Sequence, residues 1–176
     1  MSRQPRSDDQ LLLGEWACLG LVCESPRHGF ALASELRPEG EVGRVWSISR
    51  PLTYRAVDQL VGRGFIEIRG DEPGAAGGSR TIYGATRRGR AAFRNWVVEP
   101  VEHLRDLRSE LLLKLVLTHR CGFDSAGLVD RQKRMVVAVR DGLVARLDET
   151  PDDLVIRWRL RSAEGALRFL DDLSTD

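Results

Sequence analysis

Three histidines and three cysteines are the residues of this chain best suited to nucleophilic or metal-assisted chemistry. They are His28, His103 and His119, and Cys18, Cys23 and Cys121. The cysteines lack a CxxC spacing, and no histidine has a second ligand type at the spacing of a zinc site or a catalytic triad. The cysteines are odd in number and lie in apolar segments, where a free thiol behaves as a small hydrophobe. We therefore expect no enzyme activity, no metal site, no cofactor and no disulfide.

Positive charge is the second chemical feature of the sequence. The whole chain has a net charge of only +1. Residues 44–94, however, contain ten arginines and four acidic residues, which gives this stretch a charge of +6 and leaves −5 for the rest. A local positive field attracts a phosphate backbone without causing nonspecific binding by the rest of the molecule. An arginine-rich, solvated face would have the same composition, so charge alone does not decide the function.

The elements that position these residues must fit in one ordinary domain or two small ones, since the chain has 176 residues and 42% of them are apolar. The longest apolar run, residues 16–23, is far too short to span a bilayer. Residues 1–9 are polar and lack the apolar stretch of a secretion signal. We expect a cytoplasmic protein without membrane contact, in which residues 1–9 form a flexible tail.

Apolar spacing predicts three helices in the first third of the chain. Residues 10–24 are expected to form an amphipathic helix, with Leu12, Trp16, Leu19 and Cys23 along its buried stripe. A short helix is expected over residues 29–36, with Phe30, Ala33 and Leu36 facing inward.

The third helix is expected to begin after Ser49, a candidate N-cap, with Pro51 in its first turn and Gly64 at its end. Its period divides the residues into an inner and an outer side. The inner side contains Thr53, Ala56, Val57, Leu60 and Val61, and the outer side contains Pro51, Leu52, Arg55, Asp58 and Gln59.

Two strands are expected next, over residues 65–69 and 80–85, because both segments are rich in β-branched and aromatic residues. Residues 71–79, rich in glycine and alanine, would form a long hairpin loop. Thr86 is expected to cap a fourth helix that Pro100 terminates. The order helix, helix, helix, hairpin is that of a winged helix, which we assign to residues 10–100.

The remainder, residues 101–176, predicts three long helices: one over 104–118, one over 129–147, and one that begins at residues 150–153. The last helix has a seam of apolar residues at steps of four, three, four and three, namely Ile156, Leu160, Ala163, Leu167 and Leu170. This coiled-coil-like seam is a candidate subunit interface. The predicted fold is mostly α with a small two-stranded β-wing, an N-terminal winged helix-turn-helix and a C-terminal helical dimerisation domain.

Several short motifs follow one another in an informative order. They are His28-Gly29-Phe30, residues 49–60 around Tyr54, Gly64-Phe65-Ile66, and then Arg80, Tyr83, Thr86, Gly89, Arg90 and Trp96. In this order they resemble the PadR family of bacterial transcriptional regulators, in the long form with a helical C-terminal dimerisation domain. The resemblance implies a homodimeric, sequence-specific DNA-binding protein whose partner is double-stranded DNA with a palindromic operator. Repression is the usual mode of such regulators.

On this basis the third helix is expected to enter the major groove. Its outer residues Leu52, Arg55 and Gln59 would contact bases, while Ser49 and Arg50 lie at the N-terminal end that faces phosphate. Arg69 and Arg80 would hold the wing against the neighbouring backbone. The family implies a phosphate contact for Tyr54, although a core ring with its hydroxyl at the rim is an alternative. Where the family has Gly-Thr-Leu-Tyr, this chain has Pro51-Leu52-Thr53-Tyr54, so its base preference is expected to differ.

Members of the family commonly respond to small aromatic molecules. A ligand site at Phe93 and Trp96 is the corresponding hypothesis, and ordinary core packing of these aromatic residues is its alternative. Two other classes of function remain open. A winged-helix protein-interaction module would keep the fold and bind DNA without sequence preference, and an enzyme would need a constellation that we do not find.

Overall fold

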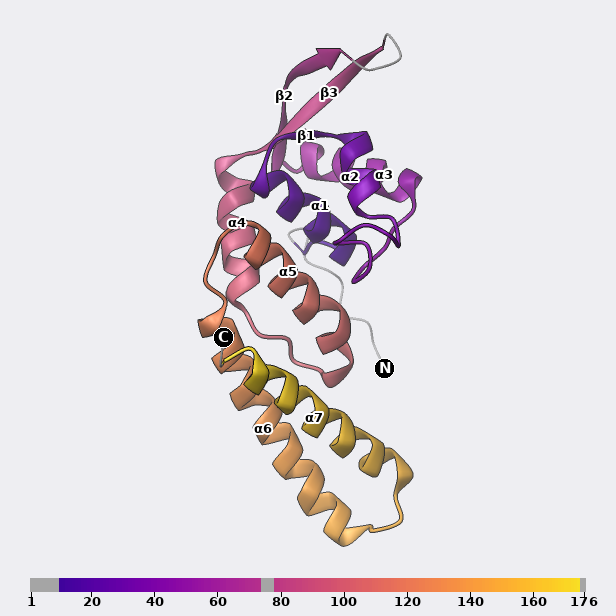
Figure 1. Ribbon diagram of the computed structural model, residues 1–176, viewed down its shortest axis with the longest axis vertical. Helices are drawn as coiled ribbons and strands as arrows, with labels where there is room; N and C mark the ends of the chain where they lie inside the picture. The colour runs from indigo at the N-terminus through magenta and orange to yellow at the C-terminus, as the bar shows by residue number, and fades with distance from the viewer. Residues whose placement is uncertain (1–9, 74–77, 175–176) are drawn as a thin grey trace. The chain divides into compact units, whose positions relative to one another are not determined.

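The computed structural model describes residues 10–73 and 78–174 (Figure 1). The predicted flexible tail, residues 1–9, lies outside the described residues. The chain divides into two compact units, with the boundary between Arg94 and Asn95. Among the described residues, no helix is both long and apolar enough to cross a bilayer.

Helix α1 (Leu13–Glu24) is the central helix of the first unit and packs against α3 and β3. Its residues 17–22 are all buried, whereas Leu12 is exposed. The prediction of an amphipathic helix with Leu12 in a buried stripe was therefore wrong. The sequence Ala-Cys-Leu-Gly-Leu-Val contains no polar residue at any angle, so this part of the helix is buried all round.

Helix α2 (Gly29–Glu35) buries Leu32 and Ala33, and its C-cap residue Leu36 is also buried. Phe30 was expected to face inward, but 49% of it is exposed. The buried residues Leu32, Ala33 and Leu36 are centred on a direction roughly 110° from Phe30, which therefore lies outside the buried side of the helix. His28 caps the helix, because its Nδ1 accepts a hydrogen bond of 2.9 Å from the backbone N–H of Ala31.

Helix α3 (Arg50–Gly62) agrees with the sequence analysis in its bounds and in its two sides. Ser49 is the N-cap residue, although its side chain makes no capping hydrogen bond. The buried hydroxyl of Thr53 donates to the carbonyl oxygen of Ser49 at 3.2 Å, so a polar residue is tolerated on the inner side. Gly64, at φ +69°, turns the chain after the helix, as only glycine does easily.

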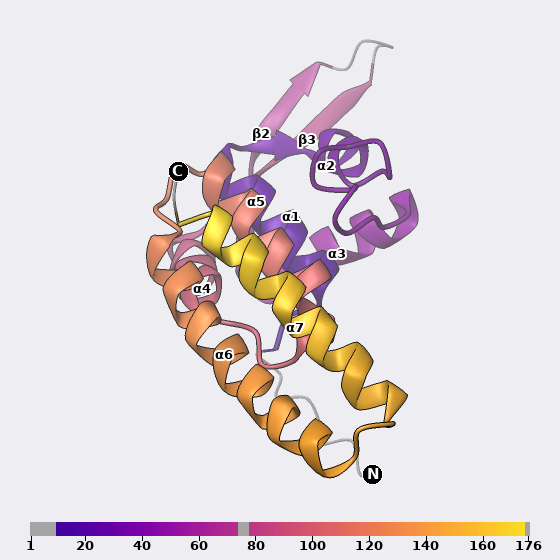
Figure 2. The same cartoon turned by 60° about the horizontal axis from the view of Figure 1, so that its bottom comes forward.

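The wing consists of β2 (Ile66–Pro73) and β3 (Ser79–Ala85), paired antiparallel from Ile66↔Ala85 to Pro73↔Ser79. In both views this hairpin projects beyond the helices of the first unit (Figures 1 and 2). The predicted hairpin is confirmed, but β2 continues through residues 71–73, which were expected to lie in the loop. A bulge interrupts the register between Ile68 and Gly70.

A third strand, β1 (Arg27–His28), pairs antiparallel with β3 and gives the sheet the order β1-β3-β2. Sequence analysis expected two strands, because two residues are too few to show a period. Helix α4 (Arg87–Val98) follows the wing. The Thr86 hydroxyl accepts from Gly89 N–H at 3.0 Å and donates to the Gly64 carbonyl at 2.8 Å, so the predicted cap also joins α4 to the turn before β2.

The second unit begins with an irregular helical segment. Residues 104–118 were expected to form one helix, but the structure has a 3₁₀ turn (Leu104–Asp106), a π-helical turn (Leu107–Leu111) and then α5 (Leu112–Arg120). Two long helices follow, α6 (Ala126–Glu149) and α7 (Leu154–Asp172), which run antiparallel side by side (Figures 1 and 2).

Helix α7 begins at Leu154 and is capped by Asp153, whose Oδ1 accepts from the N–H groups of Val155 at 2.8 Å and Ile156 at 3.0 Å. The expected start at residues 150–153 was therefore too early. The carboxylate caps two N–H groups at once, which a threonine hydroxyl at position 150 would not reach.

The predicted seam of α7 is part of the core of the second unit. Its five residues, Ile156, Leu160, Ala163, Leu167 and Leu170, are all buried within the single chain, in one cluster with residues of α6. Both halves of this coiled-coil-like contact therefore come from the same chain. A direct role of the seam in dimerisation remains a prediction.

Two buried polar side chains stabilise the segment after α4. Gln132 forms two hydrogen bonds with the backbone of Val101: its Oε1 accepts at 2.7 Å and its Nε2 donates at 3.0 Å. Lys114 Nζ donates to the Glu99 carbonyl at 2.7 Å and lies 2.9 Å from the Glu110 carboxylate. Both satisfy the rule that buried polar groups are hydrogen-bonded.

Candidate nucleic-acid interface

The outer face of α3 exposes the three side chains predicted to contact bases. Leu52 is 51% exposed, and Arg55 and Gln59 follow it on the same face, also exposed. Thr53, Val57 and Leu60 anchor the opposite side of the helix in the core. Among the described residues Arg55 has no carboxylate partner, so its guanidinium group is available to a ligand.

A second group of side chains lies beside the N-terminal end of α3. We call it the Phe30 cluster: Phe30, Arg50, Tyr54 and Arg80. The Cζ atoms of Arg50 and Arg80 lie 5.4 and 5.7 Å from the centroid of the Phe30 ring, and that of Arg50 lies 5.7 Å from the Tyr54 ring. These are cation–π contacts. A guanidinium group that lies over a ring keeps its N–H edge free, so both arginines can still donate hydrogen bonds to phosphate oxygens.

His28 links the start of α2 to the wing. Its Nε2 lies 3.5 Å from the Glu72 carboxylate and 3.5 Å from Arg80 Nη1. Because Nδ1 already accepts from Ala31, the neutral ring carries its proton on Nε2 and can donate it to Glu72. Burial raises the pKa of Tyr83 on the adjacent strand, and the carboxylate of Asp58 adds to the shift.

Gly29 allows the Phe30 cluster to form. A Cβ atom at this position would lie 2.7 Å from Cε1 of Tyr54, closer than any ordinary contact. The ring of Tyr54 therefore occupies the space above the Gly29 backbone and is half-buried there. The packed ring agrees with the interpretation of Tyr54 as a core residue, and its phosphate contact remains a prediction.

Not all of the arginines in residues 44–94 join this surface. Arg69, predicted to hold the wing on DNA, lies 2.8 Å from the Glu67 carboxylate and donates to the Ala85 carbonyl oxygen at 3.5 Å. Arg63 and Arg88 both lie over the ring of Phe65, at 5.3 and 4.6 Å. The positive charge therefore divides into a part that stabilises the fold and a part on the face formed by α3 and the wing. The DNA-binding role of Arg69 remains a prediction.

Sequence reasoning missed Phe30, His28 and Gly29 as parts of this surface. It noted all three as one motif but assigned them only to the start of a helix. The signal in the sequence was Phe30, a large aromatic residue directly after Gly29 at the start of a helix. The apolar period of so short a helix does not establish whether such a residue is buried or exposed.

The two residues of the predicted aromatic ligand site have ordinary structural surroundings. Phe93 is fully buried. Trp96 is half-buried, and Lys114 Nζ lies 5.0 Å from its ring. A ligand site at these residues remains a prediction. In the described part of the chain, no group of three or more His, Cys, Asp or Glu residues could hold a metal ion.

Comparison with known families gives one match. Residues 18–95 match the model of the Transcriptional regulator PadR-like family. This part of the chain is a PadR-like domain. It contains the last part of α1, the elements from β1 to β3 and most of α4, and hence the outer face of α3 and the Phe30 cluster. Members of the PadR-like family are transcriptional regulators, and residues 18–95 are the part of the chain to which this match applies.

Solved structures with similar folds include two of PadR from Bacillus subtilis. The one in complex with operator DNA has 18% sequence identity and a TM-score of 0.47, and the similarity covers 91% of this chain and 97% of that one. The one in complex with p-coumaric acid has 19% identity and a TM-score of 0.42, over 92% and 93% of the chains. A PadR-like regulator from Bacillus cereus has 18% identity and a TM-score of 0.40, over 92% and 96%. No protein with a curated description matches the sequence significantly.

Proposed function

We propose that this PadR-like chain is a sequence-specific DNA-binding repressor that acts as a homodimer. The observation that carries the proposal is the outer face of α3, where Leu52, Arg55 and Gln59 are exposed beside the cationic Phe30 cluster. We assign DNA binding to residues 10–100 and dimerisation to residues 101–176. A dimer bound across a promoter would repress by excluding the polymerase.

Base contacts are expected from three side chains of different chemistry. A guanidinium group donates two hydrogen bonds to guanine, a carboxamide pairs with adenine, and an aliphatic side chain contacts the thymine methyl group. Arg55, Gln59 and Leu52 supply these three groups on one exposed helical face. The operator half-site should therefore include a guanine, an adenine and a thymine opposite α3.

Phosphate contacts are expected from the N-terminal end of α3 and from the wing. The free N–H groups after Ser49 and the positive end of the helix dipole favour an anion there. Arg50 and Arg80 lie next to this end and have no carboxylate partner among the described residues. Each phosphate neutralised changes the slope of log K against log salt by about −0.9, so two arginines in each of two protomers predict about −3.6 from these residues.

The dimer interface is expected on the second apolar face of α7. The buried seam occupies one side of this helix, and Leu154, Val155, Trp158, Phe169 and Leu173 lie within an arc of roughly 100° on the other side. Leu154 and Trp158 are 74% and 72% exposed. Exposed apolar residues grouped on one side of a helix favour a protein–protein contact. We propose that a second copy of the chain covers it, because a palindromic site requires two DNA-binding domains related by a twofold axis.

Trp158→Asp tests this interface by sedimentation equilibrium. The charge would be buried without a partner in the dimer, so the variant should be monomeric at concentrations where the wild type is dimeric. Arg159→Asp introduces the same side chain at the adjacent exposed residue, which lies outside the apolar arc, and serves as the control. A wild type that is monomeric at micromolar concentration would contradict the proposed dimer.

DNA binding is tested by fluorescence anisotropy with DNA from upstream of the chain's own coding sequence and with unrelated DNA of equal length. Arg55→Ala should weaken binding to the specific DNA about 10- to 100-fold and reduce discrimination between the two DNAs. Arg50→Ala and Arg80→Ala should weaken binding to both DNAs equally and lower the salt slope. Arg134→Ala, at an exposed position of α6, is the matched control.

Two outcomes would refute the proposed function. If Arg55→Ala leaves affinity and discrimination unchanged, α3 does not contact bases. If the wild type binds both DNAs alike with little salt dependence, the winged helix is better explained as a protein-interaction module.

A further inference from the structure

Three arginines on one side of α4 take no part in the interface described above. Arg87 and Arg94 are exposed, and Arg90 is half-buried. Within the described part of the chain, no hydrogen bond, ion pair or ring contact joins their side chains to another residue. At 100° per residue the three positions lie within an arc of about 60°, so they form one row along the helix, which we call the α4 stripe.

The neighbouring sequence does not compensate the charge of the α4 stripe. Residues 73–98 contain five arginines and no acidic residue. Arg87 and Arg90 lie in the first turn of α4, where the helix dipole favours acidic side chains. Like charges three and four residues apart on a helix also repel each other. The stripe therefore weakens the isolated helix and is stabilised when a polyanion binds to it.

The α4 stripe fits a phosphate backbone better than the surface of a protein. A rise of 1.5 Å per residue places neighbouring arginines about 4.5 and 6 Å apart along the axis. The whole stripe spans about 10.5 Å, the rise of about three phosphates of one DNA strand. A protein interface needs an apolar centre, and from Arg87 to Arg94 the only exposed apolar residue is Ala91. Duplex DNA is therefore the expected partner.

The α4 stripe faces away from the end of α3. Arg88 marks the side of α4 that faces α3, because its Nη1 donates to the Arg63 carbonyl at 2.9 Å and its Cζ lies 4.6 Å from the centroid of the Phe65 ring. The centre of the stripe lies roughly 130° around the helix from Arg88. In both views α1 lies between α3 and α4 (Figures 1 and 2).

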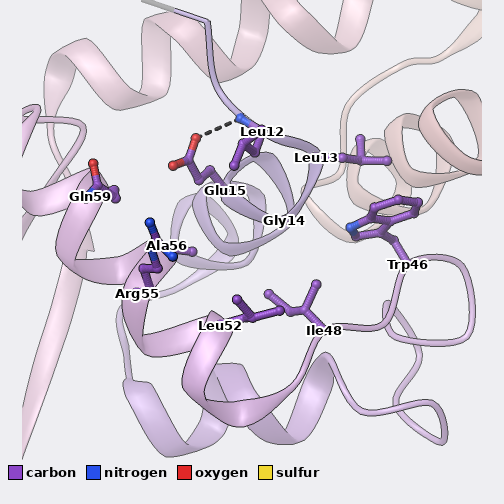
Figure 3. A pocket seen from close by; sticks show the side chains of 10 residues that line it. All are labelled: Leu12, Leu13, Gly14, Glu15, Trp46, Ile48, Leu52, Arg55, Ala56 and Gln59. Atoms are coloured by element: carbon purple, nitrogen blue, oxygen red, sulfur yellow. Dashed lines mark hydrogen bonds between the residues drawn. The ribbon is translucent and has the colours of Figure 1, made fainter. Parts of the chain in front are cut away.

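The side chains of α3 that are expected to contact bases lie elsewhere in the first unit. Leu52, Arg55 and Gln59 line a cavity together with the start of α1 and the segment before α3 (Figure 3). Among the described residues, its lining includes none from α4. A straight duplex held at this face of α3 is therefore not expected to reach the α4 stripe, and sharp bending of so short a DNA is unfavourable.

We propose that the α4 stripe binds the phosphate backbone of a second DNA segment, so that the bound regulator bridges two duplexes. The inference rests on the DNA-binding function proposed above, because α3 must hold the first duplex. Contacts to phosphate carry no sequence information, so the second segment can have any sequence. Three arginines in each of two protomers predict a slope of log K against log salt of about −5.4 for this contact.

Co-capture of two DNAs tests the proposal. Beads carry unrelated DNA, and labelled upstream DNA is added with the protein, so that bridging retains the label on the beads. Arg87→Ala/Arg94→Ala should reduce retention at least about tenfold and lower its salt slope by about 3.6, because four phosphate contacts per dimer are lost. The double variant should remain folded, since it removes repulsion from α4, and its affinity for upstream DNA alone should stay within about twofold of the wild-type value.

The matched control is Arg134→Ala/Arg146→Ala, which removes two exposed charges from α6 and should bridge like the wild type. If the α4 double variant also bridges like the wild type, for example because a dimer holds two duplexes with its two α3 faces, the proposal is overturned. It is equally overturned if the α4 double variant binds a single long duplex more weakly but a short one normally, since the stripe would then contact flanking DNA.

Two further outcomes separate this inference from its alternatives. If poly-L-glutamate binds the wild type more tightly than the α4 double variant while co-capture is equal in both, the partner is an acidic protein and the proposal is wrong. Binding of one duplex without any co-capture overturns bridging and leaves the proposed function intact. If the chain binds no DNA, the proposed function fails, and bridging fails with it.

Discussion

Replacing Gly29 by alanine tests how closely the start of α2 is fitted to Tyr54 of α3. The new Cβ atom would lie 2.7 Å from Cε1 and 3.3 Å from Cδ1 and Cζ of Tyr54. To restore an ordinary contact of 3.4 Å, the ring must retreat by about 0.7 Å. The ring is half-buried and lies under Arg50, so this movement disturbs the Phe30 cluster.

The expected cost follows from two opposing terms. Overpacking of a fitted site costs about 1–3 kcal/mol. Alanine gains roughly 0.5–1 kcal/mol over glycine in a helix. Gly29→Ala should therefore lower the free energy of unfolding by up to about 2.5 kcal/mol and weaken DNA binding severalfold. Gly62→Ala is the matched control, because nothing lies within 4 Å of its added Cβ, and it should be neutral or stabilising without an effect on DNA binding.

A double-mutant cycle with Tyr54→Ala identifies the cause. Urea unfolding gives the free energies, and anisotropy gives the DNA affinities. If the clash is with the Tyr54 ring, Gly29→Ala should cost almost nothing in the Tyr54→Ala background. An equal cost in both backgrounds, or equal behaviour of the Gly29 and Gly62 variants, would refute this account of the cluster.

Three further predictions concern the stability of the fold. Gln132→Leu leaves the buried N–H and carbonyl of Val101 without partners and should cost about 1–3 kcal/mol for each group in urea unfolding. Asp153→Ala should cost about 1 kcal/mol, and Asp153→Asn should retain most of the cap, by the same measurement. Burial raises the pKa of the Cys18 thiol from 9.0 to about 12, so the folded chain keeps a proton that the unfolded chain loses. The free energy of unfolding is therefore unaffected by the ionisation of this thiol below pH 9 and falls above it by up to about 1.4 kcal/mol per pH unit. In Cys18→Ala this part of the decrease in stability at alkaline pH should be absent.

The outer face of α3 could be predicted from the sequence because local features determine it. Pro51 and Gly64 delimit the helix, and its apolar period is regular. The exposure of Arg55 and Gln59 follows from these features alone. The hairpin was predictable for the same reason, since its strands are rich in β-branched residues.

The features that could not be predicted depend on contacts distant in sequence. Strand β1 exists only because residues 82 and 83 of β3 lie beside it. The exposure of Phe30 depends on which side of α2 packs against α3 and β3. Arg69 lies in the bulge between Ile68 and Gly70, and a bulge changes the direction of a side chain in a way that alternation does not predict.

The position of β3 between strands β1 and β2 has a consequence for the design of chimaeras between related proteins. Because β1 hydrogen-bonds to one edge of β3 and β2 to the other, the wing shares its inner strand with the segment that starts α2. A chimaera that transplants residues 66–85 alone would bring a foreign strand against Arg27 and His28. Residues 27–30 should therefore be transplanted together with the hairpin, and grafts that separate the two segments are expected to fold less well.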